Sequence, residues 1–313
     1  MTETTTTGWT VKAPPRATSL FVNGLFPRRR ALVVVSALLG GLLLAYAWPA
    51  TAVDEGFGFA AGNAPPRGFG ATALFAFVSG LAGSFTACNV AVFGAVGPLL
   101  GQMSLTRRRR LVHVLHPLGW LAAGLVPVAV VYGVLVGLFG TRTPHVRAVP
   151  AAVPPGAVQA MAVFGVVGLV LLVIGLAAVG VLPDPLAGVA RRFPNAPLVL
   201  LGALLGALLT GCPSPLVRTL FRQVALEREP LYGALVFSLQ SIAGFLVMAL
   251  LFLVLSYGFG GPVQRWLATG PGRGAALTAS AFLVAGAFAV GYWDVRLLGD
   301  LGLVWWPRAP WSG

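Results

Sequence analysis

Cys88 and Cys212 are the two cysteines of this 313-residue chain, and they are its clearest indication of chemistry. Each follows a threonine and a small residue, in Thr86-Ala87-Cys88 and in Thr210-Gly211-Cys212. A thiol pair can form and break a disulfide where one thiol has thiolate character and a partner thiol can reach it. The sequence therefore predicts a thiol–disulfide reaction at this pair. The alternative is that both cysteines are inert and buried only for packing.

Helix-breaking residues follow both cysteines. Cys212-Pro213-Ser214-Pro215 cannot form a regular helix, because Pro213 lacks an N–H group and Pro215 interrupts the next turn. At membrane depth such a break is tolerated only where protein or water satisfies the freed carbonyl groups. A wet, irregular segment beside a thiol is a place that a soluble partner's thiolate could reach. The residues expected to shape the two sites are Gly211, Pro213 and Pro215 around Cys212, and Gly94, Gly97 and Pro98 after Cys88.

The composition indicates that membrane helices position these residues. The chain is 57% hydrophobic and 9% charged, with a mean hydropathy of +0.87, whereas soluble domains carry about 25% charged residues. Apolar runs of about 18 residues or more predict transmembrane helices, so a lipid bilayer is an expected partner. The net charge of +13 comes from short arginine clusters that flank these runs. This arrangement fits the positive-inside rule and argues against a nucleic-acid partner.

We expect an all-α polytopic membrane protein with about seven transmembrane helices. The second span is too long for one straight crossing of about 20 residues, so a break near its middle is expected. The expected spans are about 31–49, 70–103, 111–139, 157–182, 197–221, 231–257 and 275–298. The expected domains are a cytoplasmic polar tail at 1–30, an N-terminal helix and external loop at 31–69, a six-helix core at 70–298 and an external tail at 299–313.

The distribution of charge predicts a cytoplasmic N-terminus and an external C-terminus. The segments expected in the cytoplasm hold 13 of the 21 basic residues and 2 of the 8 acidic residues. A signal peptide cleaved near Ala50-Thr51-Ala52 is the alternative for the first span. Its apolar run is longer than the usual h-region of about 7–15 residues, which favours a retained anchor helix.

An internal repeat is the stronger sign of organisation. Aligning Cys88 with Cys212 is an offset of 124 residues, and at that offset His116 aligns with Gln240, both polar groups in apolar runs. Three spans separate the starts of the two units, so the repeats at 70–182 and 197–298 must cross the membrane in opposite directions. Inverted repeats place their working site near the bilayer midplane, between helices interrupted by glycine or proline.

Two stretches resemble a known family. Residues 206–216, Gly-Ala-Leu-Leu-Thr-Gly-Cys-Pro-Ser-Pro-Leu, resemble the second cysteine motif of the transmembrane electron transporters of cytochrome c biogenesis and disulfide interchange, the CcdA/DsbD type. Residues 80–88 resemble the approach to the first motif. The resemblance covers about residues 70–298. The chain departs from the family pattern at Ala87, Ala91 and Gly211, where the family normally has prolines, so it is similar to a divergent member.

The resemblance implies a redox relay across a bacterial cytoplasmic membrane. Cys88 and Cys212 would be the redox pair, with Pro213 and Pro215 shaping one broken helix. Cytosolic thioredoxin would reduce the disulfide, and the dithiol would then reduce an extracytoplasmic thioredoxin-like or cytochrome-maturation partner. Such a thiol-disulfide oxidoreductase needs no cofactor.

Other polar residues carry weaker expectations. His116 and Gln240 are candidates for polar support beside the dithiol, and no third ligand accompanies His113 and His116 for a metal. Asp294, with Arg296, is expected at the outer membrane boundary. Nearby tryptophans, Trp293, Trp305, Trp306 and Trp311, are expected to form an external aromatic belt. The alternative function is a small-solute or ion transporter, or a membrane assembly subunit, with redox-inert cysteines.

Overall fold

The structure, a computed structural model, describes residues 30–47, 68–84, 107–143, 155–211, 215–258, 273–300 and 302–307. Within these ranges the chain forms helices joined by turns and contains no strand. The long helices are α1 (Arg30–Ala47), α3 (Phe69–Gly83), α5 (Arg107–Phe139), α6 (Pro155–Val179), α8 (Ala196–Gly211), α9 (Pro215–Glu227), α10 (Pro230–Gly258) and α12 (Arg273–Val290). The short elements are η1 (Gly140–Arg142), α7 (Ala187–Arg192), η2 (Gly291–Val295) and α13 (Arg296–Asp300).

Five stretches within the described residues are long and apolar enough to cross a membrane. They are Arg30–Ala47, Leu115–Arg142, Val158–Val179, Pro230–Leu251 and Ala276–Gly299. The bent pair α8 and α9 makes a sixth if it counts as one span. These helices confirm an all-α, multi-pass membrane protein. The expected number of seven spans is not confirmed, because the second expected span is described only as far as Ser84, and α3 has 15 residues.

Two helix pairs run parallel and cross at glycines. On α5 and α8, Gly202 faces Leu121, and Gly206, one turn later, faces Leu125, also one turn later, so the contacts advance along both helices in the same direction. Likewise Phe69 of α3 lies against Tyr232 of α10, and Gly80 farther along α3 faces Gln240 farther along α10. The close backbone approach at each crossing requires a residue without a side chain, as in other membrane helix pairs.

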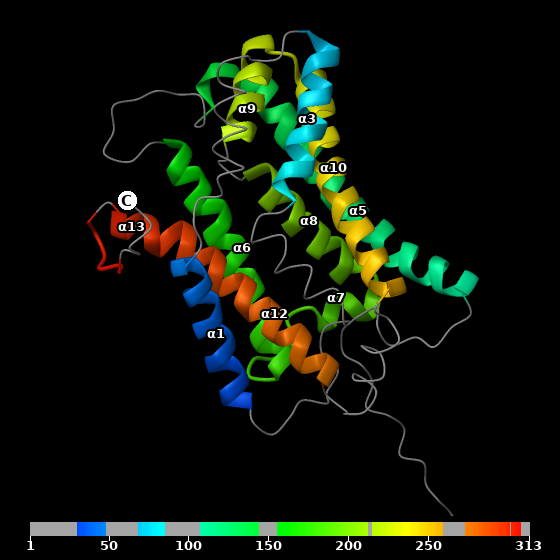
Figure 1. Cartoon of the computed structure of the whole chain (residues 1–313), viewed down its shortest axis with the longest axis vertical. Helices are drawn as coiled ribbons and strands as arrows, with labels where there is room; N and C mark the ends of the chain where they lie inside the picture. Colours follow the sequence, from blue (N-terminus) through cyan, green and yellow to red (C-terminus); the bar gives the residue numbers. More distant parts are fainter. Residues whose placement is uncertain are drawn as a thin grey trace, which may run out of the picture.

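The longest helices pair in antiparallel fashion. Gly133 of α5 faces Gly233 of α10, and Gly137, one turn later, faces Glu229, one turn earlier. On α6 and α12, Gly168 faces Gly286 and Gly175 faces Leu283. α1 lies parallel to α12, with Gly41 against Ala287. Consequently α1, α5, α8 and α12 run in one direction and α3, α6 and α10 in the other (Figure 1).

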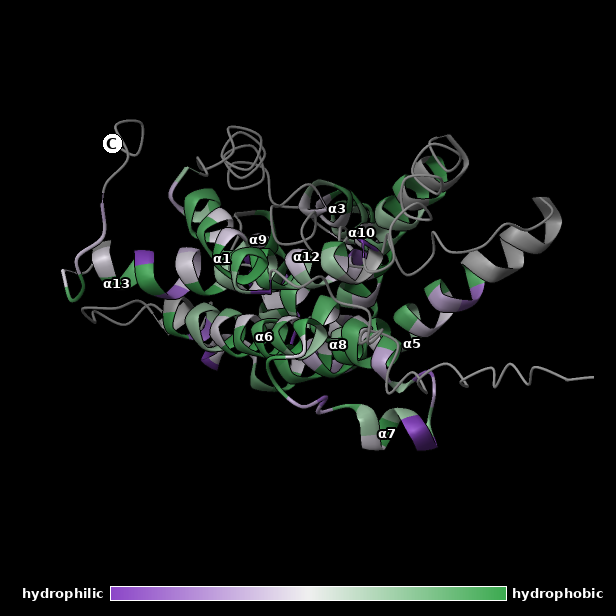
Figure 2. Ribbon diagram, turned by 90° about the horizontal axis from the view of Figure 1, so that it is seen from below, coloured by the Kyte–Doolittle hydropathy of each residue, from purple (hydrophilic) through white to green (hydrophobic). Residues whose placement is uncertain are grey.

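Apolar side chains fill the space between the helices and also cover their outer faces. One cluster joins α5, α6, α8 and α12, and a second joins α3, α5, α9 and α10. Large apolar side chains such as Leu43, Leu74 and Val166 are more than half exposed, as expected for faces that contact lipid acyl chains. In Figure 2 the ribbons of α6 and α8 are apolar along their length, whereas hydrophilic residues mark the end of the short helix α7.

Candidate functional site

The structure describes the two helices that flank Cys212. Cys88, Cys212, Pro213, Gly94, Gly97 and Pro98 lie outside the described residues. Gly211 is the last residue of α8, and Pro215 is the first residue of α9. Proline suits a first helical position because the N–H that it lacks would have no partner there. The axes of the two helices differ in direction by 84°.

The ends of α3 and α8 meet on one turn of α10. Ser84 follows the last residue of α3, and its hydroxyl donates to the carbonyl oxygens of Gly80, at 2.8 Å, and of Gly244 on α10, at 3.1 Å. The Leu209 side chain of α8 lies 3.3 Å from where a Cβ on Gly244 would stand. The helix turns that lead toward Cys88 and toward Cys212 therefore converge on Gly244.

The end of α8 also contacts α6. Gly211 is buried, and a Cβ at this position would lie 2.9 Å from the side chain of Val163. The hydroxyl of Thr210 is satisfied within α8, since it donates to the Gly206 carbonyl at 2.7 Å. The last turn of α8 is thus held between α6 and α10, where only a small residue fits at position 211.

Three buried oxygens that have no hydrogen-bond partner among the described residues lie close to this meeting point. They are Ser79 Oγ on α3, and Gln240 Oε1 and Ser241 Oγ on α10. All three side chains are 3% exposed or less. Ser79 precedes Gly80, which contacts the Gln240 backbone, so the three groups belong to the α3–α10 crossing. Unsatisfied polar groups in hydrocarbon cost several kcal/mol each, so such sites hold water or a polar ligand.

His116 and Gln240 have different surroundings. Gln240 is buried at the α3–α10 crossing, whereas His116 lies exposed on α5. His116 Nε2 accepts a hydrogen bond from Trp120 Nε1 at 3.2 Å, one turn along the same helix. The structure therefore places Gln240, and not His116, beside the meeting point of α3 and α8.

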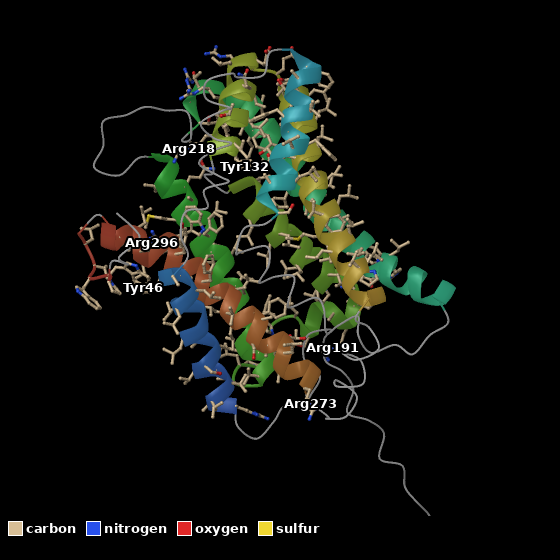
Figure 3. The ribbon with its side chains drawn as sticks, viewed as in Figure 1. Tyr46, Tyr132, Arg191, Arg218, Arg273 and Arg296 are labelled. Atoms are coloured by element: carbon tan, nitrogen blue, oxygen red, sulfur yellow. The ribbon has the colours of Figure 1, made fainter. Side chains whose placement is uncertain are left out.

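Polar groups that the sequence did not single out lie toward the other end of α5 and α6. The Gln159 side chain donates to the Tyr132 hydroxyl, and the Tyr132 ring packs edge-on against Phe221 and Phe237. Figure 3 shows Tyr132 in the upper part of the bundle, the part that also holds Arg218 of α9. In the sequence, a tyrosine inside an apolar run cannot be told from any other core aromatic residue. Nothing in the sequence therefore predicted the hydrogen bond between Tyr132 and Gln159.

The described residues contain no group of three histidine, cysteine or acidic side chains that could hold a metal ion. Comparison of the chain with protein-family models, with curated proteins and with solved structures finds no match.

Proposed function

We propose that the protein is a membrane thiol–disulfide electron transporter in which Cys88 and Cys212 form the redox pair. The observation that carries the proposal is the convergence of α3 and α8 on Gly244. Cys88 stands four residues after Ser84, and Cys212 stands three residues after Leu209. Segments of that length extend at most about 14 Å and about 10 Å. The two segments that lead to the cysteines therefore begin close together. Both are short enough that the two sulfur atoms can come within the distance that a disulfide needs.

The helix directions support an inverted repeat. If 70–182 and 197–298 are two copies, α3 corresponds to α8, α5 to α10 and α6 to α12. Exchange of the copies turns the parallel α3–α10 crossing into the parallel α8–α5 crossing, and both crossings use glycine. The same exchange replaces α5 by α10 and α6 by α12, so it leaves the pairs α5–α10 and α6–α12 unchanged, and both pairs are antiparallel. This pattern is the one expected when two copies cross the membrane in opposite directions.

The unsatisfied oxygens supply what the chemistry needs around a membrane thiol. A thiol in a dry apolar core reacts slowly, because its thiolate is not stabilised there. Water held by Ser79, Gln240 and Ser241 would solvate a thiolate at the break after α8 and carry its proton. The residues Gly211 and Pro215 bound that break and keep the helix from closing over Cys212.

In the proposed cycle, a thiolate of reduced cytosolic thioredoxin attacks one sulfur of the Cys88–Cys212 disulfide, and the other sulfur leaves as a thiolate. The second thioredoxin thiol resolves the mixed disulfide, so thioredoxin leaves oxidised and the pair is reduced. Two electrons pass, and the cysteine thiolates take up the two protons that the thioredoxin thiols release. The reduced pair then repeats this exchange on the disulfide of an extracytoplasmic thioredoxin-like or cytochrome-maturation partner.

The test is the redox state of the two thiols in the purified full chain. We expect alkylation to label no cysteine after mild oxidation and two after reduction, read as a gel shift. The Cys88→Ser and Cys212→Ser variants should each label one cysteine in both states. Thioredoxin without its resolving cysteine should attack the disulfide of the oxidised chain with both cysteines and stay attached as a mixed disulfide. Two free thiols that resist oxidation would reject the proposal and leave the inert-cysteine alternative.

A further inference from the structure

Asp294 lies inside the last membrane-spanning segment, in a turn of irregular helix. The span runs from Ala276 to Gly299, and the helix widens to a π-helical turn at Gly291–Val295. Single π-helical turns inside α-helices are frequent at functional sites. An ionisable side chain within a span is costly and usually marks an ion or proton site.

The carboxylate of Asp294 faces the neighbouring helix α6 at Gly165. A Cβ on Gly165 would lie 3.0 Å from one carboxylate oxygen of Asp294 and 3.1 Å from the other. Gly165 therefore leaves the space that the carboxylate occupies. Asp294 lies in the π-helical turn, and its carboxylate contacts α6.

The contact lies inside two candidate membrane spans, because Gly165 comes seven residues after Val158, where one span begins, and Asp294 comes five residues before Gly299, where the other ends. Gly165 stands ten residues after Pro155, where α6 begins, which is about 15 Å along a helix. α6 has 25 residues, so Gly165 is nearer to its middle than to its end. At this depth water is scarce, and a bare carboxylate requires a neutralising partner.

Two buried polar atoms of this turn, Asp294 Oδ2 and Trp293 Nε1, have no hydrogen-bond partner within the part of the chain that the structure describes. The Trp293 ring is stacked on Phe164 of α6, with ring centroids 4.7 Å apart, which holds the indole in place. The carboxylate oxygen is an acceptor that a proton or a cation can satisfy, whereas the Trp293 N–H can only donate.

We propose that Asp294 is an intramembrane binding site for a monovalent cation, either a proton or an alkali metal ion. The site goes beyond the proposed thiol chemistry and does not depend on the cysteines. Gly165 supplies room for the bound carboxyl, and the π-helical turn directs it away from lipid.

The charged and titratable groups around the site are few. α6 contains none along its whole length, and α12 has only Arg273 at its far end. Tyr46 lies near the end of α1, Tyr292 is in the same turn as Asp294, and α13 carries Arg296 and Asp300. The Arg296 guanidinium lies over the Tyr292 ring, 4.8 Å from its centroid, and Figure 3 shows Arg296 and Tyr46 on the same side of the molecule, near the middle of its long axis.

The test uses dicyclohexylcarbodiimide, an apolar reagent that modifies protonated carboxyl groups, on the full chain in detergent micelles, with peptide mass spectrometry. We expect an adduct on Asp294 and little on the exposed Glu229. For a proton site, the yield of the Asp294 adduct falls about tenfold for each pH unit above the midpoint of its titration. Added sodium or potassium chloride then leaves the yield unchanged. For an alkali cation site, one of these salts lowers the yield at constant pH. Either result supports the proposal.

Two variants control the labelling. Asp294→Asn keeps the shape of the side chain and should lose the adduct. Gly165→Ala puts a methyl group where the carboxylate lies and should lower the Asp294 adduct several-fold, while Gly119→Ala, at a site with open space, should not. The elution volume from size exclusion verifies that each variant is folded. Labelling of Asp294 no greater than that of Glu229 at every pH would overturn the proposal.

Discussion

Polar side chains in the apolar core differ in whether they have a hydrogen-bond partner. Thr210 and Ser238 donate to the carbonyl one turn earlier on their own helices. Ser84 donates both to its own helix and across to α10. Ser79 and Ser241 are equally buried and have no partner. The first group holds helices in place, and the second is free to hold a ligand or water.

This difference predicts opposite effects of the same substitution. Ser84→Ala removes both hydrogen bonds and should destabilise the protein by about 1 kcal/mol, because it also leaves the Gly244 carbonyl without this donor. Ser241→Ala removes a buried hydroxyl that has no partner and should be neutral or stabilising. The midpoint of thermal unfolding in detergent measures both. A loss of stability in Ser241→Ala equal to that in Ser84→Ala would contradict this interpretation.

The sequence shows which residues are polar and where the apolar runs lie, but it does not show which side of a helix faces the rest of the protein. The surroundings of single polar residues could therefore not be predicted from it. His116 and Gln240 have the same character in sequence, a polar residue in an apolar run. Packing separates them, since glycines of α3 bring α10 close at Gln240, while His116 lies outside. The sequence also gives no sign of the π-helical turn at Gly291–Val295, which holds Asp294.

Among the helices, the bounds follow closely from the apolar runs. The expected spans 157–182 and 231–257 correspond to α6, Pro155–Val179, and α10, Pro230–Gly258. The expected span 197–221 corresponds to two helices joined at residues 212–214. Apolar length determines where a helix can span, whereas the bend depends on how α9 packs. Its face of Val217, Leu220, Phe221 and Val224 is buried against α3, α5 and α10.

Glycines at the crossings predict which helix contacts are indispensable. Gly133 and Gly233 face each other so closely that a Cβ on either would overlap the carbonyl oxygen of the other. Gly133→Ala should therefore push α5 and α10 apart and destabilise the protein by about 1–3 kcal/mol or more. Gly119→Ala, on the same helix with nothing within 4 Å, is the matched control and should be neutral or slightly stabilising. Equal unfolding midpoints for the two variants would show that the crossing is looser than described.

Arginines lie at both ends of the described structure (Figure 3). Arg30 at the start of α1 donates to the Gly180 carbonyl just after α6, so the N-terminal end of α1 and the connection from α6 to α8 lie together. Arg191 and Arg273 lie toward this same lower end, whereas Tyr132 and Arg218 lie at the upper end (Figure 3). The positive-inside rule assigns the lower end to the cytoplasm if the charge distribution of the full sequence sets the orientation.

This arrangement predicts the sides of the membrane on which two loops are exposed. Gly188 is exposed on α7 at the lower end, and Glu229 is exposed where α10 begins, against Gly137 near the upper end of α5. In a background of Cys88→Ser and Cys212→Ser, a membrane-impermeant maleimide should label Gly188→Cys only from the cytoplasmic side and Glu229→Cys only from the outside. Inside-out and right-side-out vesicles provide the two measurements, and detergent-solubilised protein provides the control for reactivity.

Because only α8 and α9 separate the two positions, labelling of both from one side would mean that this bent pair re-enters the membrane instead of crossing it. The copies would then not be inverted, and the shared origin of Cys88 and Cys212 near Gly244 would need another explanation.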